Sequence, residues 1–101
     1  MRLLLIFFLI FFSSSNQSKQ LVIGHRGAKG HMAENTLASI KKAMELGAHG
    51  IEIDVFRCLT GEIVLFHDKK LDFLTNGKGL IENKSLSELK KLKVLGSSEG
   101  I

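Results

Sequence analysis

The sequence predicts an α/β fold, namely the N-terminal part of a (β/α)₈ barrel of the TIM type that is incomplete in this chain. Three observations carry this prediction. An apolar run at residues 21–23 stops at a glycine, residues 37–44 have apolar positions at helical spacing, and residues 51–55 alternate between apolar and acidic side chains. Successive units of strand and helix favour a parallel sheet, and a closed barrel takes about 250 residues, whereas this chain has 101.

The first expected unit is a strand, a loop and a helix. The run 21–23 is typical of a buried parallel strand, and it stops at Gly24. Asn35 or Thr36 can cap the following helix, and Gly47 is expected to end it. The apolar positions that define one face of this helix are Leu37, Ile40, Ala43 and Met44.

The second expected unit begins with one strand over residues 51–55. A two-residue turn at Thr60 and Gly61 is expected to lead into an apolar strand over residues 63–66, which ends at His67.

The last part of the chain is expected to turn at residues 74–77 and then to form a helix. Ser85 and Glu88 have the spacing of a capping box, so the helix is expected to begin there. Its apolar positions would be Leu89, Leu92 and Leu95.

Residues 1–18 are expected to form a signal peptide, because a short basic start precedes ten uninterrupted Leu, Ile and Phe residues and a small, polar stretch. Ten residues extend about 15 Å as a helix, whereas a membrane crossing needs about 20 residues. Export to the periplasm or the medium is therefore expected. A segment that stays uncleaved and holds the chain at a membrane is the alternative.

The composition is compatible with an anionic small-molecule ligand. The formal net charge is +4, which suits a phosphate or a weak contact with an anionic membrane surface, and serves solubility equally well. The single cysteine, Cys58, excludes an intrachain disulfide. The sequence has no zinc-site spacing, P-loop or GxGxxG pattern, and neither a nucleotide cofactor nor a nucleic-acid partner is expected. The oligomeric state stays open.

Two carboxylates are the first candidate site residues. Glu52 and Asp54 are two positions apart on the expected strand, so both side chains leave one face with Cα atoms about 6.6 Å apart. They can converge on one cation, because carboxylate oxygens are preferred ligands of Ca²⁺ and Mg²⁺. A sheet with one hydrated face explains the same pattern, and the spacing alone does not separate the two readings.

Two histidines and an arginine complete the candidate site. A two-residue turn at Thr60 and Gly61 would place His67 directly opposite Asp54. His25 comes at the carboxyl end of the first strand, where barrel enzymes keep their active sites. A pair of histidines can accept and donate protons in phosphodiester cleavage, and Arg26 can bind phosphate oxygens. Each histidine taken alone is more often structural.

Six ordered motifs between roughly residues 21 and 95 carry a family resemblance. They are His25-Arg26-Gly27, Glu34-Asn35-Thr36, Gly47-Ala48, Ile51-Glu52-Ile53-Asp54-Val55, Phe66-His67-Asp68 and Leu74-Thr75-Asn76-Gly77. Their order resembles the beginning of the glycerophosphodiester phosphodiesterases. One departure is Ala33, where the family usually has proline.

The resemblance implies a TIM barrel that hydrolyses glycerophosphodiesters to glycerol 3-phosphate and an alcohol. It implies catalytic roles for His25 and His67, a phosphate contact for Arg26, Ca²⁺ or Mg²⁺ ligands at Glu52 and Asp54, and a place beside the site for Glu34. Residues 19–101 would then be a truncated N-terminal segment of the domain, ending before the strand that supplies a third acidic ligand.

The sequence leaves two other functions open. One is a non-catalytic exported fragment that keeps the motifs of the family by descent. The other is a related barrel phospholipase D that acts on choline lipids.

Overall fold

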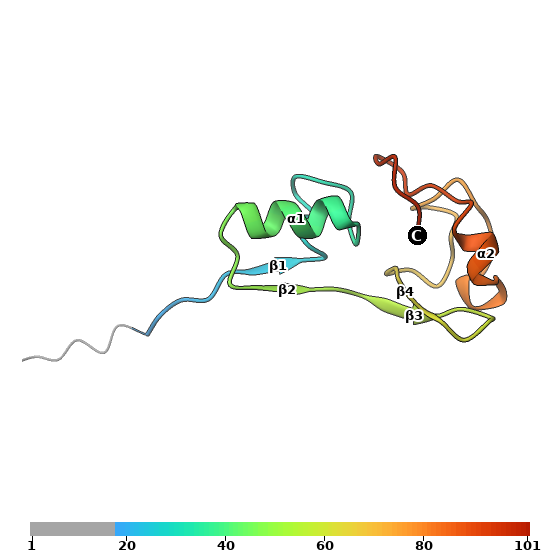
Figure 1. Ribbon diagram of the computed structural model, residues 1–101, viewed down its shortest axis with the longest axis horizontal. Coiled ribbons are helices and arrows are strands. Elements are labelled where there is room, and N and C mark those ends of the chain that lie inside the picture. Colours follow the sequence, from blue (N-terminus) through green and yellow to red (C-terminus); the bar gives the residue numbers. More distant parts are fainter. Residues whose placement is uncertain (1–17) are drawn as a thin grey trace, which may run out of the picture.

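The computed structural model describes residues 18–101, which form four short strands and three short helices. In chain order these are β1 (Ile23–His25), α1 (Leu37–Glu45), β2 (Gly50–Glu52), β3 (Val55–Arg57), β4 (Ile63–Leu65), the 3₁₀ helix η1 (Ile81–Asn83) and α2 (Leu86–Leu89). Figure 1 shows α1 lying along β1 and β2 at one end, and β3, β4 and α2 gathered at the other. The chain is α/β, as the sequence predicts.

The expected signal peptide, residues 1–18, lies outside the described residues except for its last position. It therefore stays a prediction. Within residues 18–101, no helix has both the length and the apolar character that a bilayer crossing needs.

β1 and β2 pair in parallel, and this confirms the arrangement expected for the first unit. Their register sets His25 opposite Glu52. The strand begins two residues later than expected, because Val22 bonds to His49 outside the ladder. The backbone N–H of His49 donates to the Val22 carbonyl at 2.8 Å, and the Val22 N–H donates to His49 Nδ1 at 3.0 Å.

α1 packs against β1 and the loop that follows through small residues. A Cβ added at Gly24 would lie 3.1 Å from the Ala43 Cβ, and one added at Gly27 would lie 2.4 Å from the Ser39 Oγ. Ser39 and Ala43 are accordingly buried. The two glycines therefore determine which face of the helix is covered.

The expectation that residues 21–23 form a buried strand is wrong. Residues 21–23 are each more than half exposed, because α1 covers a single side of the strand pair (Figure 1). Leu37 and Met44 are also exposed. Gly24 and Gly27 pack against Ala43 and Ser39, so the helix buries these two small residues rather than its most apolar face.

The helix termini follow local signals in the sequence. Of the two possible caps, Thr36 is the one used, and its Oγ1 accepts a hydrogen bond from the Ser39 N–H at 3.1 Å. α1 ends at Glu45, and Gly47 follows with φ of +81° in the left-handed region, as expected of a helix stop.

The single strand expected over residues 51–55 is wrong, because β2 ends at Glu52 and β3 begins at Val55. Asp54 instead bonds to residues of two other segments. Its N–H donates to Asn35 Oδ1 at 3.1 Å, and its carbonyl accepts from the Phe66 N–H at 3.0 Å. The interruption is thus the point at which the parallel and antiparallel pairs are joined.

The β3–β4 hairpin has a three-residue loop, not the two-residue turn that the sequence suggested. The N–H of Cys58 donates to the Glu62 carbonyl at 2.9 Å, which leaves residues 59–61 as the loop. Gly61 has φ of +98°, as a three-residue loop with a left-handed third position requires.

This loop shifts the strand register by one residue. Val55 lies opposite Leu65, and the backbone contact beyond that pair joins Asp54 to Phe66. The expectation that His67 lies directly opposite Asp54 is therefore wrong. Because side chains alternate along a strand, a slip of one residue moves His67 to the other face of the ribbon.

The hydrophobic core lies between the hairpin and the C-terminal segment. Its buried members are Cys58, Val64, Phe66, Leu71, Ile81 and Leu89. Ser85 caps α2, and the capping box with Glu88 is present as expected.

α2 is shorter than expected, since it ends at Leu89 and Leu95 is 56% exposed. The reason is a competing pairing of the backbone. Val94 forms an antiparallel bridge with Thr75, and the Leu95 N–H donates to the Leu74 carbonyl at 2.9 Å. The chain turns over residues 72–74 and bends at residue 76, close to the expected turn.

We expect Gly27→Ala to lower the free energy of unfolding by about 2 kcal/mol or more. Gly27 has φ of +83°, and the added Cβ would meet Ser39 Oγ at 2.4 Å and the Ser39 carbonyl carbon at 2.7 Å. Urea unfolding of the 101-residue chain, followed by circular dichroism, measures the change. Gly30→Ala is the control, because nothing lies within 4 Å of its added Cβ. Equal midpoints for the two variants would contradict this account.

Candidate functional site

Arg26 stands at the centre of the candidate site, directly after β1. Its backbone N–H donates to Glu52 Oε2 at 3.1 Å, and its Nη1 donates to Glu34 Oε1 at 2.9 Å. Its Nε lies 3.2 Å from Asp54 Oδ2. The Arg26 side chain is only 13% exposed. One arginine therefore contacts three acidic residues.

The contact between Arg26 and Asp54 is an ion pair without hydrogen-bond alignment. The Nε atom is buried and has no hydrogen-bond partner among the described residues, although the carboxylate is close. Attraction between opposite charges is strong where water is excluded, so the pair still constrains both side chains.

The Arg26 backbone has φ of +53°, a left-handed conformation that is uncommon for residues other than glycine. Its carbonyl accepts two hydrogen bonds, from the Asn35 N–H at 3.0 Å and from Ser39 Oγ at 2.9 Å. These bonds hold the turn that directs the guanidinium toward Glu34 and Asp54.

Asn35 belongs to the same cluster. Its Nδ2 donates to Asp54 Oδ2 at 3.1 Å, and its Oδ1 accepts from the Asp54 N–H at 3.1 Å. The sequence indicated Asn35 as a possible helix cap and as part of the Glu34-Asn35-Thr36 motif, and did not predict its contact with Asp54. A signal was present in the residue type, because asparagine tolerates the left-handed backbone that it adopts here with φ of +52°.

His25 and Glu52 come together as the sequence predicts, at the ends of paired strands. His25 Nε2 lies 3.7 Å from Glu52 Oε2. Their side chains are 63% and 43% exposed, so both are accessible to a ligand.

His67 is held separately from the other candidates. Its Nδ1 lies 2.6 Å from Asp68 Oδ1, in a side-chain hydrogen bond. Within residues 18–101, no hydrogen bond or ion pair joins His67 to His25, Glu52 or Asp54.

Glu52 and Asp54 are the candidate ligands for a divalent cation. Among the described residues, no three side chains of His, Cys, Asp or Glu lie close enough together to hold a metal ion. Glu52 and Asp54 nevertheless offer the hard oxygen donors that Ca²⁺ and Mg²⁺ prefer, and both approach Arg26 from β2 and the segment after it. The two side chains suit such an ion by the chemistry of their donors, and Ca²⁺ or Mg²⁺ would need further ligands beside them.

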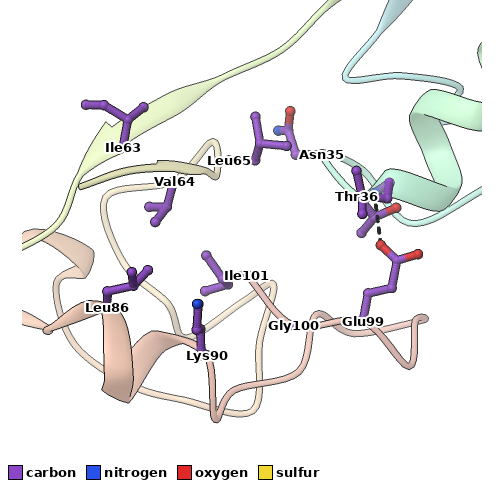
Figure 2. A pocket seen from close by; sticks show the side chains of 11 residues that line it. Asn35, Thr36, Ile63, Val64, Leu65, Leu86, Lys90, Glu99, Gly100 and Ile101 are labelled. Carbon is purple, nitrogen blue, oxygen red and sulfur yellow. Dashed lines mark hydrogen bonds between the residues drawn. The ribbon is translucent and has the colours of Figure 1, made fainter.

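Two hollows border this cluster. One of about 500 Å³ lies beside His25 and is lined by the loop residues Gly27, Ala28, Lys29, Gly30 and His31. The other, of about 640 Å³, lies between the start of α1 and the hairpin. Figure 2 shows Lys90 and Ile101 pointing into it and the Glu99 carboxylate bonded at the start of α1, where it accepts from the Leu37 and Ala38 N–H groups at 2.9 and 3.1 Å.

Comparison with known proteins identifies the family. The sequence model of the glycerophosphoryl diester phosphodiesterase family matches residues 25–100. The chain belongs to this family. A glycerophosphodiester phosphodiesterase of Caldanaerobacter subterraneus subsp. tengcongensis is 50% identical over 74 residues, which are 73% of this chain and 30% of the relative.

Solved structures of glycerophosphodiester phosphodiesterases share the fold. The enzyme from Agrobacterium tumefaciens is 36% identical with a TM-score of 0.73, over 75% of this chain and 33% of that one. An Oleispira antarctica phosphodiesterase, in complex with the product sn-glycerol-3-phosphate, is 45% identical with a TM-score of 0.72, over 74% of this chain and 30% of that one. The structural neighbours are TIM-barrel proteins, and this chain spans about a third of their length.

We expect Arg26→Ala to lower the free energy of unfolding by about 2–3 kcal/mol, because it removes the cation beside Asp54 and the nearer of the two cations beside Glu34 in a poorly hydrated place. Urea titration of the chain measures the change. Lys29→Ala is the matched control, because its Nζ also approaches Glu34, at 3.5 Å, but from a side chain that is 46% exposed. The control should cost less than about 1 kcal/mol. A similar loss of unfolding free energy in both variants would show that the buried contacts of Arg26 stabilise the fold no more than the exposed contact of Lys29 does.

Proposed function

We propose that this protein is a metal-dependent phosphodiesterase that hydrolyses glycerophosphodiesters to glycerol 3-phosphate and an alcohol. The observation that carries the proposal is the contact of Arg26 with Glu34, Glu52 and Asp54 at the ends of β1 and β2. The cluster combines a phosphate-binding cation with carboxylates suited to a divalent ion. The glycerol 3-phosphate bound to the Oleispira relative supports the substrate class.

The residues of this chain divide the chemistry between binding and proton transfer. Glu52 and Asp54 contribute ligands to a Ca²⁺ or Mg²⁺ ion, which when bound polarises the phosphate oxygens. Arg26 keeps its carboxylate partners at Nε and Nη1 and presents the remaining edge of its guanidinium to the phosphate. Glu34 holds that orientation from beside the site.

His25 and His67 are the proposed proton carriers. One histidine accepts the proton of the nucleophile, and the other donates a proton to the alkoxide that leaves when the phosphorus–oxygen bond breaks. The bond between Asp68 and His67 Nδ1 supports such a role, because it leaves Nε2 of the ring for the substrate.

We also propose that the chain forms the N-terminal part of a (β/α)₈ barrel and that residues 1–18 export the protein. The exposed apolar side chains of Val22, Ile23, Ile53 and Val55 support the first point, because a closed barrel would cover such residues.

A chimera tests the proposed activity. The matching 74-residue segment of the Caldanaerobacter relative is replaced by the corresponding residues of this chain, and the parent relative is the control. With Ca²⁺ or Mg²⁺, the chimera should release glycerol 3-phosphate from glycerophosphocholine, and it should lose this activity in the presence of a chelator. A folded chimera without turnover would contradict the proposal. Preferential cleavage of lysophosphatidylcholine would instead indicate the phospholipase D reading.

In the same chimera, His25→Ala and His67→Ala should each lower kcat by about a hundredfold or more, because each removes one proton-transfer step. His49→Ala is the control, since His49 bonds only to Val22 at the entry to β1 among the described residues. The control should affect stability and leave kcat within about twofold of the unsubstituted chimera. A normal kcat in either test variant would return that histidine to a structural role.

A further inference from the structure

Asn35 is the one member of the Arg26 cluster that has no role in the proposed chemistry. It is 7% exposed, and the oxygen and the nitrogen of its carboxamide each bond to the same residue, Asp54. The oxygen accepts from the Asp54 backbone, and the nitrogen donates to the Asp54 carboxylate, each at 3.1 Å. This two-point contact fixes both the position and the orientation of one candidate metal ligand.

The backbone at Asp54 requires such a partner. The ladder with β1 ends at Glu52 and the ladder with β4 begins at Val55, so the Asp54 N–H is outside both. The site is partly buried, where an N–H without a partner costs free energy, and Asn35 Oδ1 supplies the missing acceptor. The side chain of Asn35 therefore takes the place of a neighbouring strand.

Asn35 also contacts Arg26, which forms the ion pair with Asp54. The Asn35 N–H donates to the Arg26 carbonyl at 3.0 Å. Asp54 Oδ2 accepts the hydrogen bond from Asn35 Nδ2 and forms the ion pair with Arg26 Nε. The other carboxylate oxygen, Oδ1, is therefore left for another ligand. Helix capping does not explain these contacts, because the cap of α1 is Thr36.

We propose that Asn35 is a positioning residue that orients Asp54 for metal binding. It holds one carboxylate oxygen toward Arg26, and the other oxygen is then available to share a divalent ion with Glu52. This inference rests on the proposed function, in which Asp54 is a metal ligand. A carboxamide suits the role because it combines a donor and an acceptor in one rigid group.

Asn35→Gly in the chimera tests the role, because glycine keeps the left-handed backbone and removes the side chain that carries the carboxamide. Calorimetric titration with Ca²⁺ in the absence of substrate should show a Kd raised by about tenfold or more, as for other groups that orient metal ligands. At saturating Ca²⁺, kcat should fall while KM for glycerophosphocholine changes by less than about threefold, since the phosphate contact of Arg26 remains.

The control is Thr36→Ala, which removes the cap of α1 and leaves the Asn35 carboxamide in place. It should lower the melting temperature and leave the Kd for Ca²⁺ unchanged. A double-mutant cycle with Asp54→Asn shows whether Asn35 acts through Asp54. If it does, adding Asn35→Gly to Asp54→Asn should weaken Ca²⁺ binding by less than about twofold further.

An unchanged Kd for Ca²⁺ in folded Asn35→Gly, or full additivity in the cycle, would overturn the inference. If either result is found while the unsubstituted chimera is active, the proposed function stands and only the role of Asn35 is lost. If Asn35→Gly does not fold, the side-chain amide resonances of Asn35 in the unsubstituted chimera decide the question. They should shift on addition of Ca²⁺, and unshifted resonances would count against the inference.

Discussion

The placement of one arginine between carboxylates constrains the whole of the candidate site. Arg26 brings a charge into a region where its side chain is 13% exposed, and a charge in such a place must be paired. Glu34 and Asp54 provide the pairing, and the Arg26 N–H in turn holds Glu52. The left-handed backbone at Arg26 is what allows its N–H and its guanidinium to contact different carboxylates.

The interruption between β2 and β3 follows from the same contacts. A continuous strand would have kept Asp54 in a regular ladder, with its N–H bonded to a neighbouring strand. Instead its N–H bonds to Asn35 and its carbonyl bonds to Phe66, so one residue connects the loop after β1 with the hairpin. The break is therefore the joint that sets a carboxylate beside Arg26.

The packing of α1 shows how small residues serve this arrangement. Gly27 directly follows Arg26, and the absence of its Cβ lets Ser39 approach closely enough to bond the Arg26 carbonyl. The helix thus supports the site through Ser39, while the apolar Leu37 and Met44 stay on the surface. Several apolar strand residues are exposed as well, and exposed strand edges favour association with further strands.

The sequence by itself determined the features that depend on neighbours within a few positions. The Thr36 cap, the Ser85 capping box, the glycine after α1 and the order of strand and helix were all predictable, because the donors and acceptors lie close along the chain. The sequence also placed His25 and Glu52 at one site, although it put Glu52 inside a strand over residues 51–55, and the structure shows that it ends β2.

Only the tertiary structure decided the register of His67 and the role of Asn35. One extra residue in the hairpin loop moved His67 away from Asp54, and turns of two and three residues differ too little in sequence for that length to be read from Thr60 and Gly61. Asn35 and Asp54 are 19 residues apart and belong to no common periodic pattern. Their contact exists because a buried charge and an interrupted strand require a donor and an acceptor at one place in space.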